Sequence, residues 1–237
     1  MCGRYALSAM ATEIAEEFHT SGEPERTLPV DWNIKPTQDI YIIKAKARNL
    51  EVVSWGLIAP WSKDGESAFK SQSQAINARS ETVHEKPTFR NAFHNRRCLI
   101  PASGYYEWAT ELGELKSKQP VFISRNDSHL LAFAGIFDTW RSPEGVLRNS
   151  AAILTCDAVG KLAKVHNRMP VFLPKKLWNK WLDPELTDAG KLIELVESRE
   201  DDSELRYWPV RPLVNSIKNN GAALIEPLEP GDPETLF

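Results

Sequence analysis

A succession of short strand-like runs in the second half of the chain is the feature that most constrains its fold. From Arg97 onward, runs of apolar, β-branched and aromatic residues alternate with turn signals such as Gly113 and the stretch around Gly145. The runs are Cys98–Ala102, Gly104–Ala109, Val121–Arg125, Leu130–Trp140 and Ser150–Thr155. Many short strands separated by turns predict a sheet that curves or closes into a barrel.

Further elements are predicted on both sides of this stretch. Strands are expected at Ile40–Lys44, Leu50–Trp55, Met169–Leu173, Trp208–Pro212 and Ala223–Ile225. Ser8 resembles the cap of a helix whose apolar residues recur at four-residue spacing, Met10, Ile14 and Phe18. Other helices are expected at 88–95, 178–182 and 184–198, and the polar stretch Ser62–Ala75 is predicted to be a loop.

These elements indicate a single α+β domain. The chain has 237 residues, with 42% hydrophobic and 26% charged residues, which is typical of a globular protein with a substantial core. There is no repeat and no linker, so we expect residues 1–226 to form one domain with a curved, mostly antiparallel, barrel-like sheet and flanking helices. Residues 227–237, with three prolines and three acids, are expected to form a tail.

The charge of the chain is nearly balanced but unevenly distributed. The net charge is −3, residues 70–97 carry six Lys or Arg against two acids, and residues 183–206 carry nine acids against three bases. A locally basic face fits phosphate binding by a patch. No apolar run reaches the ~20 residues of a membrane span, so we expect no membrane contact and a cytoplasmic or nuclear location.

The cysteines do not form a framework. Cys2, Cys98 and Cys156 are odd in number and widely spaced, which argues against disulfides and against a zinc site. Cys98 and Cys156 lie in apolar runs and are interpreted as core residues. We therefore expect no metal and no cofactor.

Cys2 is different because it directly follows Met1. Removal of Met1 would give Cys2 a free α-amine beside its thiol, a 1,2-aminothiol that no internal residue can supply. The amine titrates near ~7.7–8.0 and a thiol near ~8.5, so both would be partly nucleophilic at neutral pH. Such a pair can attack a carbonyl, or condense with an aldehyde to an imine and then a thiazolidine ring. A small apolar role for an early cysteine is the alternative.

Two titratable residues lie where a strand alone would not require them. Glu107 stands in the aromatic run Gly104–Trp108, where burial would raise its pKa and suit it to acid–base chemistry, unless it faces solvent. His166 falls between a short helix and a strand, and is either structural or catalytic.

Three residues could contact a nucleic acid. Asn77 and Arg79 share a face if their segment is extended, and an amide and a guanidinium there could hold a sugar and a phosphate, or cap a turn. Trp61 lies in a loop, where an exposed indole would stack on an unpaired base.

A series of short motifs resembles a known family. In order, the motifs are MCGRY, WGLIAPW, INARSET, RCLIPASGYYEW, FAGIFDTW, ILT, HNRMPVFL and VNSIKN, and they extend from residue 1 to about residue 225. They are similar to the successive motifs of the SOS response-associated peptidase (SRAP) family.

The resemblance implies binding of single-stranded DNA by a monomer and capture of abasic sites, whose open-chain aldehyde the exposed Cys2 would trap as a thiazolidine cross-link. By motif position, Asn77 would hold the sugar, Glu107 would serve acid–base steps, and His166 would assist proton transfer. The same resemblance implies autoproteolytic removal of Met1. It implies DNA contacts by Arg4, Pro36, Trp61, Arg79 and Arg168, although Arg4 has no clear role beyond local charge.

The chain departs from the family pattern in its DNA-facing loop. Trp61 is followed by Ser62, where some members have a second tryptophan, and Ser103 precedes Gly104, where an Asp is common. Three other functions remain open: an N-terminal-nucleophile amidohydrolase, which would hydrolyse glutamine; a passive single-strand binder, which Cys2→Ala would not affect; and a peptidase acting on other proteins.

Overall fold

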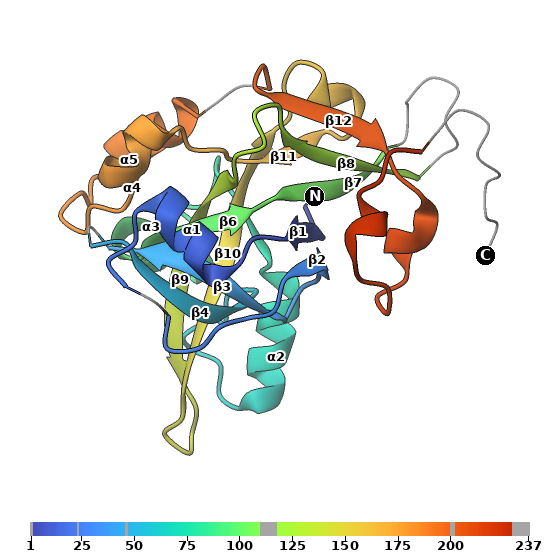
Figure 1. Cartoon of the computed structure of the whole chain (residues 1–237). Helices are drawn as coiled ribbons and strands as arrows, with labels where there is room; N and C mark the ends of the chain where they lie inside the picture. The colour runs from blue at the N-terminus through green and yellow to red at the C-terminus, as the bar shows by residue number, and fades with distance from the viewer. Residues whose placement is uncertain (1, 23, 46, 110–117, 200–201, 229–237) are drawn as a thin grey trace.

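The computed structural model describes residues 2–22, 24–45, 47–109, 118–199 and 202–228. Within these ranges the fold consists of two curved sheets with helices at the margins, as the strand pattern predicted (Figure 1). None of the helices in the described ranges is long and apolar enough to cross a bilayer.

The first sheet closes into a barrel. Its strands are β3 (Asp39–Lys44), β4 (Asn49–Trp55), β6 (Arg97–Ala102), β9 (Leu131–Arg141) and β10 (Leu147–Asp157). β4 pairs with β3, β3 with β6, β6 with β9 and β9 with β10, all antiparallel. The ring closes through a parallel pairing of β10 with β4. These five strands therefore form a closed barrel rather than an open sheet.

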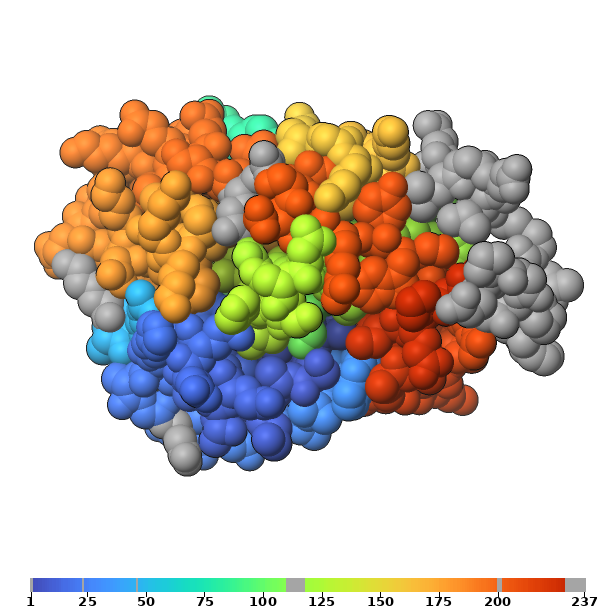
Figure 2. Space-filling model, turned by 45° about the horizontal axis from the view of Figure 1, so that its top comes forward, coloured from blue at the N-terminus to red at the C-terminus, as the bar shows by residue number. Residues whose placement is uncertain are grey.

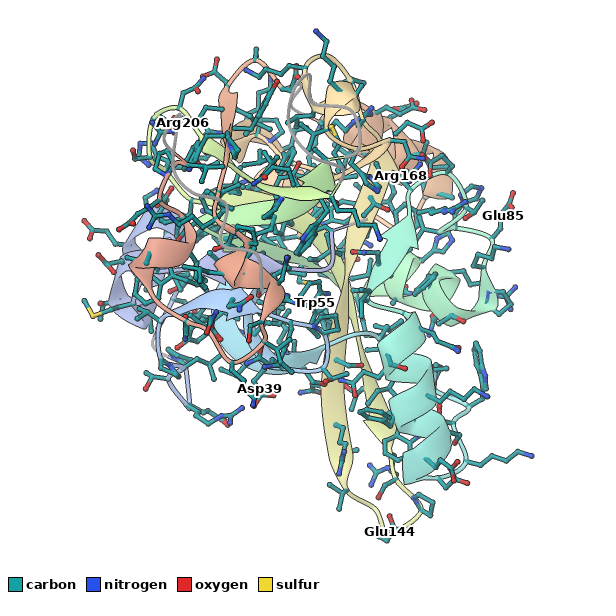
Figure 3. All side chains as sticks on the ribbon, turned by 90° about the vertical axis from the view of Figure 1, so that its right-hand side faces the viewer. Asp39, Trp55, Glu85, Glu144, Arg168 and Arg206 are labelled. Carbon is teal, nitrogen blue, oxygen red and sulfur yellow. The ribbon has the colours of Figure 1, made fainter. Side chains whose placement is uncertain are left out.

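β10 is long enough to carry two further strands beyond the barrel. β5 (Asn77–Arg79) pairs with it in parallel, and β11 (Arg168–Pro170) pairs with it antiparallel. In Figure 3 the long hairpin of β9 and β10 runs from Glu144 at its tip to the region of Arg168 at its other end. Two candidate segments distant in sequence thus flank one strand.

The second sheet carries the N-terminal strand at its interior. Its order is β12 (Leu205–Pro209), β8 (Gln119–Arg125), β7 (Gly104–Ala109), β1 (Tyr5–Leu7) and β2 (Asp31–Ile34). β1 pairs with both β7 and β2, and Tyr5 lies opposite Tyr105. Both rings pack edge-on against Phe133 of the barrel, at 6.0 and 6.1 Å between centroids. This aromatic contact joins the two sheets into one core.

The helices lie at the margins. They are α1 (Ala11–Phe18), α2 (Gly65–Gln74), α3 (Pro87–Asn95), α4 (Trp178–Trp181) and α5 (Ala189–Glu197), with 3-10 turns η1 (Leu162–Lys164), η2 (Lys175–Leu177), η3 (Pro212–Asn215) and η4 (Ala222–Leu224). The helix α1 does not begin at Ser8. Glu13 accepts a hydrogen bond from the backbone N–H of Met10, while Ser8 bonds to the Ser103 hydroxyl.

The predicted loop at 62–75 was wrong, because it contains α2. Asp64 caps this helix by accepting from the Ser67 N–H at 2.8 Å, and Ala68 and Gln72 form its buried face. Its polar composition hid a helix whose stability comes from its cap and from two buried positions. The predicted strand at 223–225 is also wrong, since those residues form η4.

Gly56 in the second motif has a clear structural reason. It adopts φ +108°, and a Cβ there would lie 2.2 Å from the Gln72 carbonyl oxygen. Only glycine allows the chain to turn from β4 against α2 at this point. At the other end of the chain, Pro227 forms a bridge with Val210, and residues 229–237 of the predicted tail 227–237 lie outside the described residues.

Candidate functional site

The candidate site is centred on Cys2, which is fully buried immediately before β1. The Asn77 side chain, from the start of β5, donates from Nδ2 to the Cys2 carbonyl oxygen at 2.8 Å. A carbonyl can only accept, so the amide nitrogen faces Cys2 and Oδ1 points away from it. Oδ1 is buried and has no hydrogen-bond partner among the described residues. The site therefore holds an unused acceptor next to Cys2.

Glu107 projects from β7 on the same face as Tyr105, because alternate strand residues share a face. It is only 4% exposed, which resolves the alternative of a solvent-facing side chain. Burial raises the pKa of Glu107, and the nearby charge of His166 partly offsets that rise. This agrees with the pKa expected from its aromatic setting.

The thiol of Cys2 differs from the sequence-based expectation. Burial, with the charge of Glu107 as a second contribution, raises the pKa of Cys2 well above its ordinary value. The sequence-based expectation concerned a solvated thiol after removal of Met1, whereas this shift belongs to the buried thiol in the chain that begins at Met1. Partial ionisation of the thiol in the processed protein stays a prediction. Burial therefore favours the neutral thiol in this structure. The structural state of Met1 lies outside the described residues.

His166 lies between η1 and β11, as predicted. Its Nδ1 accepts a hydrogen bond from the backbone N–H of Arg168 at 2.9 Å. The same Nδ1 also lies 3.2 Å from the Arg168 carbonyl oxygen, so both polar groups of the Arg168 main chain contact this ring nitrogen. The structure thus brings Cys2, Asn77, Glu107 and His166 to one place.

Of the residues expected on DNA, Trp61 and Arg79 are exposed. The Trp61 side chain is 56% exposed, and its loop is held by the Trp140 indole, which donates to the Ser62 carbonyl at 2.8 Å. Arg79 is exposed at the end of β5, two residues from Asn77 in extended backbone. Pro36 is half-buried just after β2.

Arg4 and Arg168 instead make contacts within the protein. Arg4 donates to the Asn33 side-chain oxygen at 2.6 Å and to the Val214 carbonyl at 3.0 Å. Arg168 forms ion pairs with Glu81 and Asp157. Asn33 and Glu81 were missed by the sequence reasoning. Glu81 stands within the motif that supplied Asn77 and Arg79, whereas nothing in the sequence distinguishes Asn33.

Fewer of the basic residues of the segment 70–97 are exposed than the sequence contains. Arg97 is buried and donates to four backbone carbonyls, those of Phe93, His94, Trp181 and Asp183. Arg96 pairs with Asp138 at 2.8 Å. These two arginines tie α3 and α4 to the barrel, so the exposed basic residues of this segment are Lys70, Arg79, Lys86 and Arg90.

A cavity of about 500 Å³ lies apart from these residues. Its walls come from α1, the turn before β9 and residues 173–178, which meet to the left of centre in Figure 2 as blue, lime and orange surfaces. None of the nine predicted site residues lines it. The Cys2 site is therefore a compact polar cluster and not this cavity. Within the described ranges, no group of three His, Cys, Asp or Glu side chains could hold a metal.

The fold and the site define a class: a β-barrel protein with a cysteine-centred polar site at its N-terminal strand. The family model described as SOS response associated peptidase (SRAP) matches residues 1–217. The chain therefore belongs to the SRAP family, as its motifs predicted.

Curated relatives agree. The chain is 38% identical over 229 residues to the abasic site processing protein YoqW of Bacillus subtilis, covering 95% of this chain and 99% of the relative. It is 31% identical over 201 residues to the abasic site processing protein HMCES of Rattus norvegicus, covering 74% of this chain and 56% of the relative.

Among solved structures, a Bacteroides thetaiotaomicron protein matches with a TM-score of 0.85 at 24% identity, covering 96% of this chain and 100% of that one. This likeness confirms the fold.

Proposed function

We propose that this protein binds single-stranded DNA and captures abasic sites covalently through Cys2. The observation that carries the proposal is the convergence of Cys2 with Asn77, Glu107 and His166, each of which lies 75 or more residues after Cys2 in the chain. The names of the relatives, which process abasic sites, support the same substrate. The lesion supplies an aldehyde, which is the partner that a 1,2-aminothiol requires.

The proposed reaction begins with removal of Met1. Hydrolysis of the Met1–Cys2 peptide bond by the chain itself consumes one water and frees the Cys2 amine. The amine adds to the aldehyde carbon, and loss of one water gives an imine. The thiol sulfur then adds to the imine carbon, and its proton passes by way of Glu107 to the nitrogen, which closes a thiazolidine. The net condensation releases one water.

The site residues suit these steps. The Cys2 thiol is neutral, so Glu107 takes its proton as sulfur attacks, and a raised pKa gives Glu107 the basicity to do so. His166 donates a proton to the hydroxyl that leaves as water. The free Oδ1 of Asn77 accepts a hydrogen bond from the sugar or from the amine.

The DNA contacts of the proposal rest on exposure. Trp61 offers a stacking surface for an unpaired base, and Arg79 offers a charge for a phosphate two residues from Asn77. Pro36 lies just after β2, Arg4 contacts Asn33 of β2, and both are proposed to support the DNA backbone there.

Intact mass spectrometry tests the proposal. The protein is weighed before and after mixing with a single-stranded oligonucleotide that contains one abasic site. We expect a protein lacking Met1 and an adduct equal to protein plus DNA minus one water. Cys98→Ala, which removes a buried cysteine elsewhere, should form the adduct, and Cys2→Ala should not.

Cys2→Ser separates the two covalent steps. It keeps the amine but has no thiol, so it should give only an imine, detected after borohydride reduction. A stable adduct with Cys2→Ala would contradict the mechanism. Glutamine hydrolysis without an adduct would favour the amidohydrolase.

A further inference from the structure

Of the Phe, Tyr and Trp side chains that the structure describes, two are exposed, and both belong to one short segment. Trp61 is 56% exposed in the loop before α2, and Phe69 is 61% exposed within α2. The other Phe, Tyr and Trp side chains of the described ranges are buried or half-buried. Most of the Phe69 ring is therefore not used in packing the fold, and it is open to a partner.

The inner face of α2 is fixed by other residues. Ala68 packs in a small buried cluster with Ile58 and Trp140, and Gln72 is also buried. The helix lies beside the hairpin of β9 and β10 (Figure 3). Phe69 follows Ala68 by one residue, which is about 100° around the helix, so it lies on the flank of α2 and not on its inner face.

The surface beside Phe69 is open. Gly65 lies one turn before Phe69 on the same side of the helix, and a Cβ on Gly65 would have no other atom within 4 Å. Helical side chains lean toward the N-terminus of their helix, which here is the end next to the loop of Trp61. The Phe69 ring therefore borders an open surface on the side of that loop, where a flat group can lie against it.

The charge of this segment does not by itself attract DNA. Lys63 and Lys70 are balanced by Asp64 and Glu66. Any gain in DNA binding at α2 must therefore come from its exposed rings more than from its charge. Base stacking on an aromatic ring needs no charge and tolerates every base, because each base has a π face.

The segment also leads directly to the Cys2 site. α2 ends at Gln74, and Asn77, which contacts Cys2, follows three residues later. Five helical residues and three extended ones separate Phe69 from Asn77, a path of at most about 18 Å. A DNA strand held at Cys2 can therefore reach α2 within a few nucleotides.

We propose that Phe69 is a second stacking residue for single-stranded DNA, which binds an unpaired base next to the base that stacks on Trp61. The base lies over Gly65, and α2 becomes part of the DNA-binding surface. Ser62, which follows Trp61, offers no ring, so the second aromatic surface of this segment comes from the helix. This inference rests on the proposed function and extends its DNA contacts.

The first experiment measures binding of a fluorescein-labelled single-stranded oligonucleotide without a lesion, by fluorescence anisotropy. Loss of one stacked base raises Kd by about 5- to 150-fold, and we expect Phe69→Ala to do so. Phe69→Leu keeps an apolar side chain without an aromatic face and should bind as weakly, whereas Phe69→Trp should restore binding. Met10→Ala is the matched control, because it removes a similarly exposed apolar side chain before α1 and should change nothing.

The salt dependence of the same binding separates stacking from charge. Stacking releases no counterions, so Phe69→Ala should weaken binding equally at every salt concentration. Arg79→Ala should instead lower the slope of log K against log salt by about 0.7, as expected for one phosphate contact on a single strand. A slope lowered as much by Phe69→Ala would overturn the inference, because it would show that phosphate contacts and not stacking were lost.

The second experiment fills the surface on which the base is proposed to lie. Gly65→Gln adds a side chain beside Phe69, and it should not destabilise α2, because Gln has a higher helix propensity than Gly. We expect Kd for the same oligonucleotide to rise about 5-fold or more while the urea midpoint is kept. Unchanged affinity in Gly65→Gln would refute the position of the base over Gly65.

The outcomes separate the inference from the proposed function. If the unaltered protein does not bind the oligonucleotide, the proposed function fails. If it binds and Trp61→Ala weakens binding while Phe69→Ala does not, the second stacking residue is refuted and the proposed function stands.

Discussion

Substitution of Asn77 offers the sharpest test of the site, because stability and reactivity should respond differently. Asn77→Ala removes the donor to the Cys2 carbonyl, which leaves a buried acceptor at a cost of about 1–3 kcal/mol. It also removes the buried Oδ1 that has no partner among the described residues, which recovers about 1–3 kcal/mol. The two effects cancel, so we expect the free energy of unfolding to change by less than about 1 kcal/mol.

In contrast to the stability, the rate of cross-link formation should fall in Asn77→Ala. If Oδ1 accepts a hydrogen bond from the charged amine or the sugar during the reaction, its loss costs about 1.5–3 kcal/mol, which is about 10- to 150-fold in rate. Urea denaturation measures the first quantity, and the single-turnover rate of cross-link formation measures the second.

Asn33 provides the matched control for Asn77. It is 3% exposed, and its amide is fully used: Oδ1 accepts from Arg4, and Nδ2 donates to the carbonyls of Ser216 and Asn219. Asn33→Ala should therefore destabilise the protein by about 3 kcal/mol. The reasoning is refuted if Asn77→Ala destabilises the protein as much as Asn33→Ala while the cross-linking rate is unchanged.

Three further predictions follow from burial and exposure. Glu107 has a raised pKa in the folded protein, so the stability linked to its neutral form is present at low pH and is lost as pH rises through that raised pKa. Glu107→Gln should therefore flatten the decline of the free energy of unfolding with pH, measured by urea denaturation. An equal decline in the variant would contradict this prediction. Arg97→Met leaves four carbonyls without their donor and should cost about 3 kcal/mol or more, whereas a urea midpoint within error of the unaltered protein would show that those bonds contribute little. Trp61→Ala should weaken single-strand binding by about 1–3 kcal/mol, measured by fluorescence anisotropy, without changing stability; unchanged affinity would remove Trp61 from the DNA surface.

The strands of the second half could be predicted from the sequence because their signal is local. Turn residues bound each run, and alternation along Gly104–Ala109 places Tyr105 and Glu107 on one face. The same signal indicated a barrel-like sheet, but it did not indicate which strands close the barrel, a parallel pairing in which Ser54 lies opposite Ser150. Sequence pattern carries no information on a contact between strands so far apart along the chain.

The errors in charge and in local structure have a common physical cause. A count of basic residues treats every arginine as solvated, yet Arg97 is bound by carbonyls and Arg168 by carboxylates. The polar stretch at α2 was read as a loop because its helix depends on a cap and on packing of Ala68 and Gln72 against the barrel, not on a strong apolar stripe. In each case the tertiary partner decides the outcome.

Burial couples Cys2 and Glu107 in a way that bears on the chemistry. Each is desolvated, and a negative charge on Glu107 raises the pKa of the Cys2 thiol. Two negative charges in one buried site are strongly disfavoured, so the site admits one at a time. When the carboxylate is the charged member, transfer of the thiol proton to Glu107 moves the charge onto sulfur without adding a second one. In the proposed mechanism, the burial that keeps the resting thiol neutral therefore also directs its proton to Glu107 when sulfur attacks.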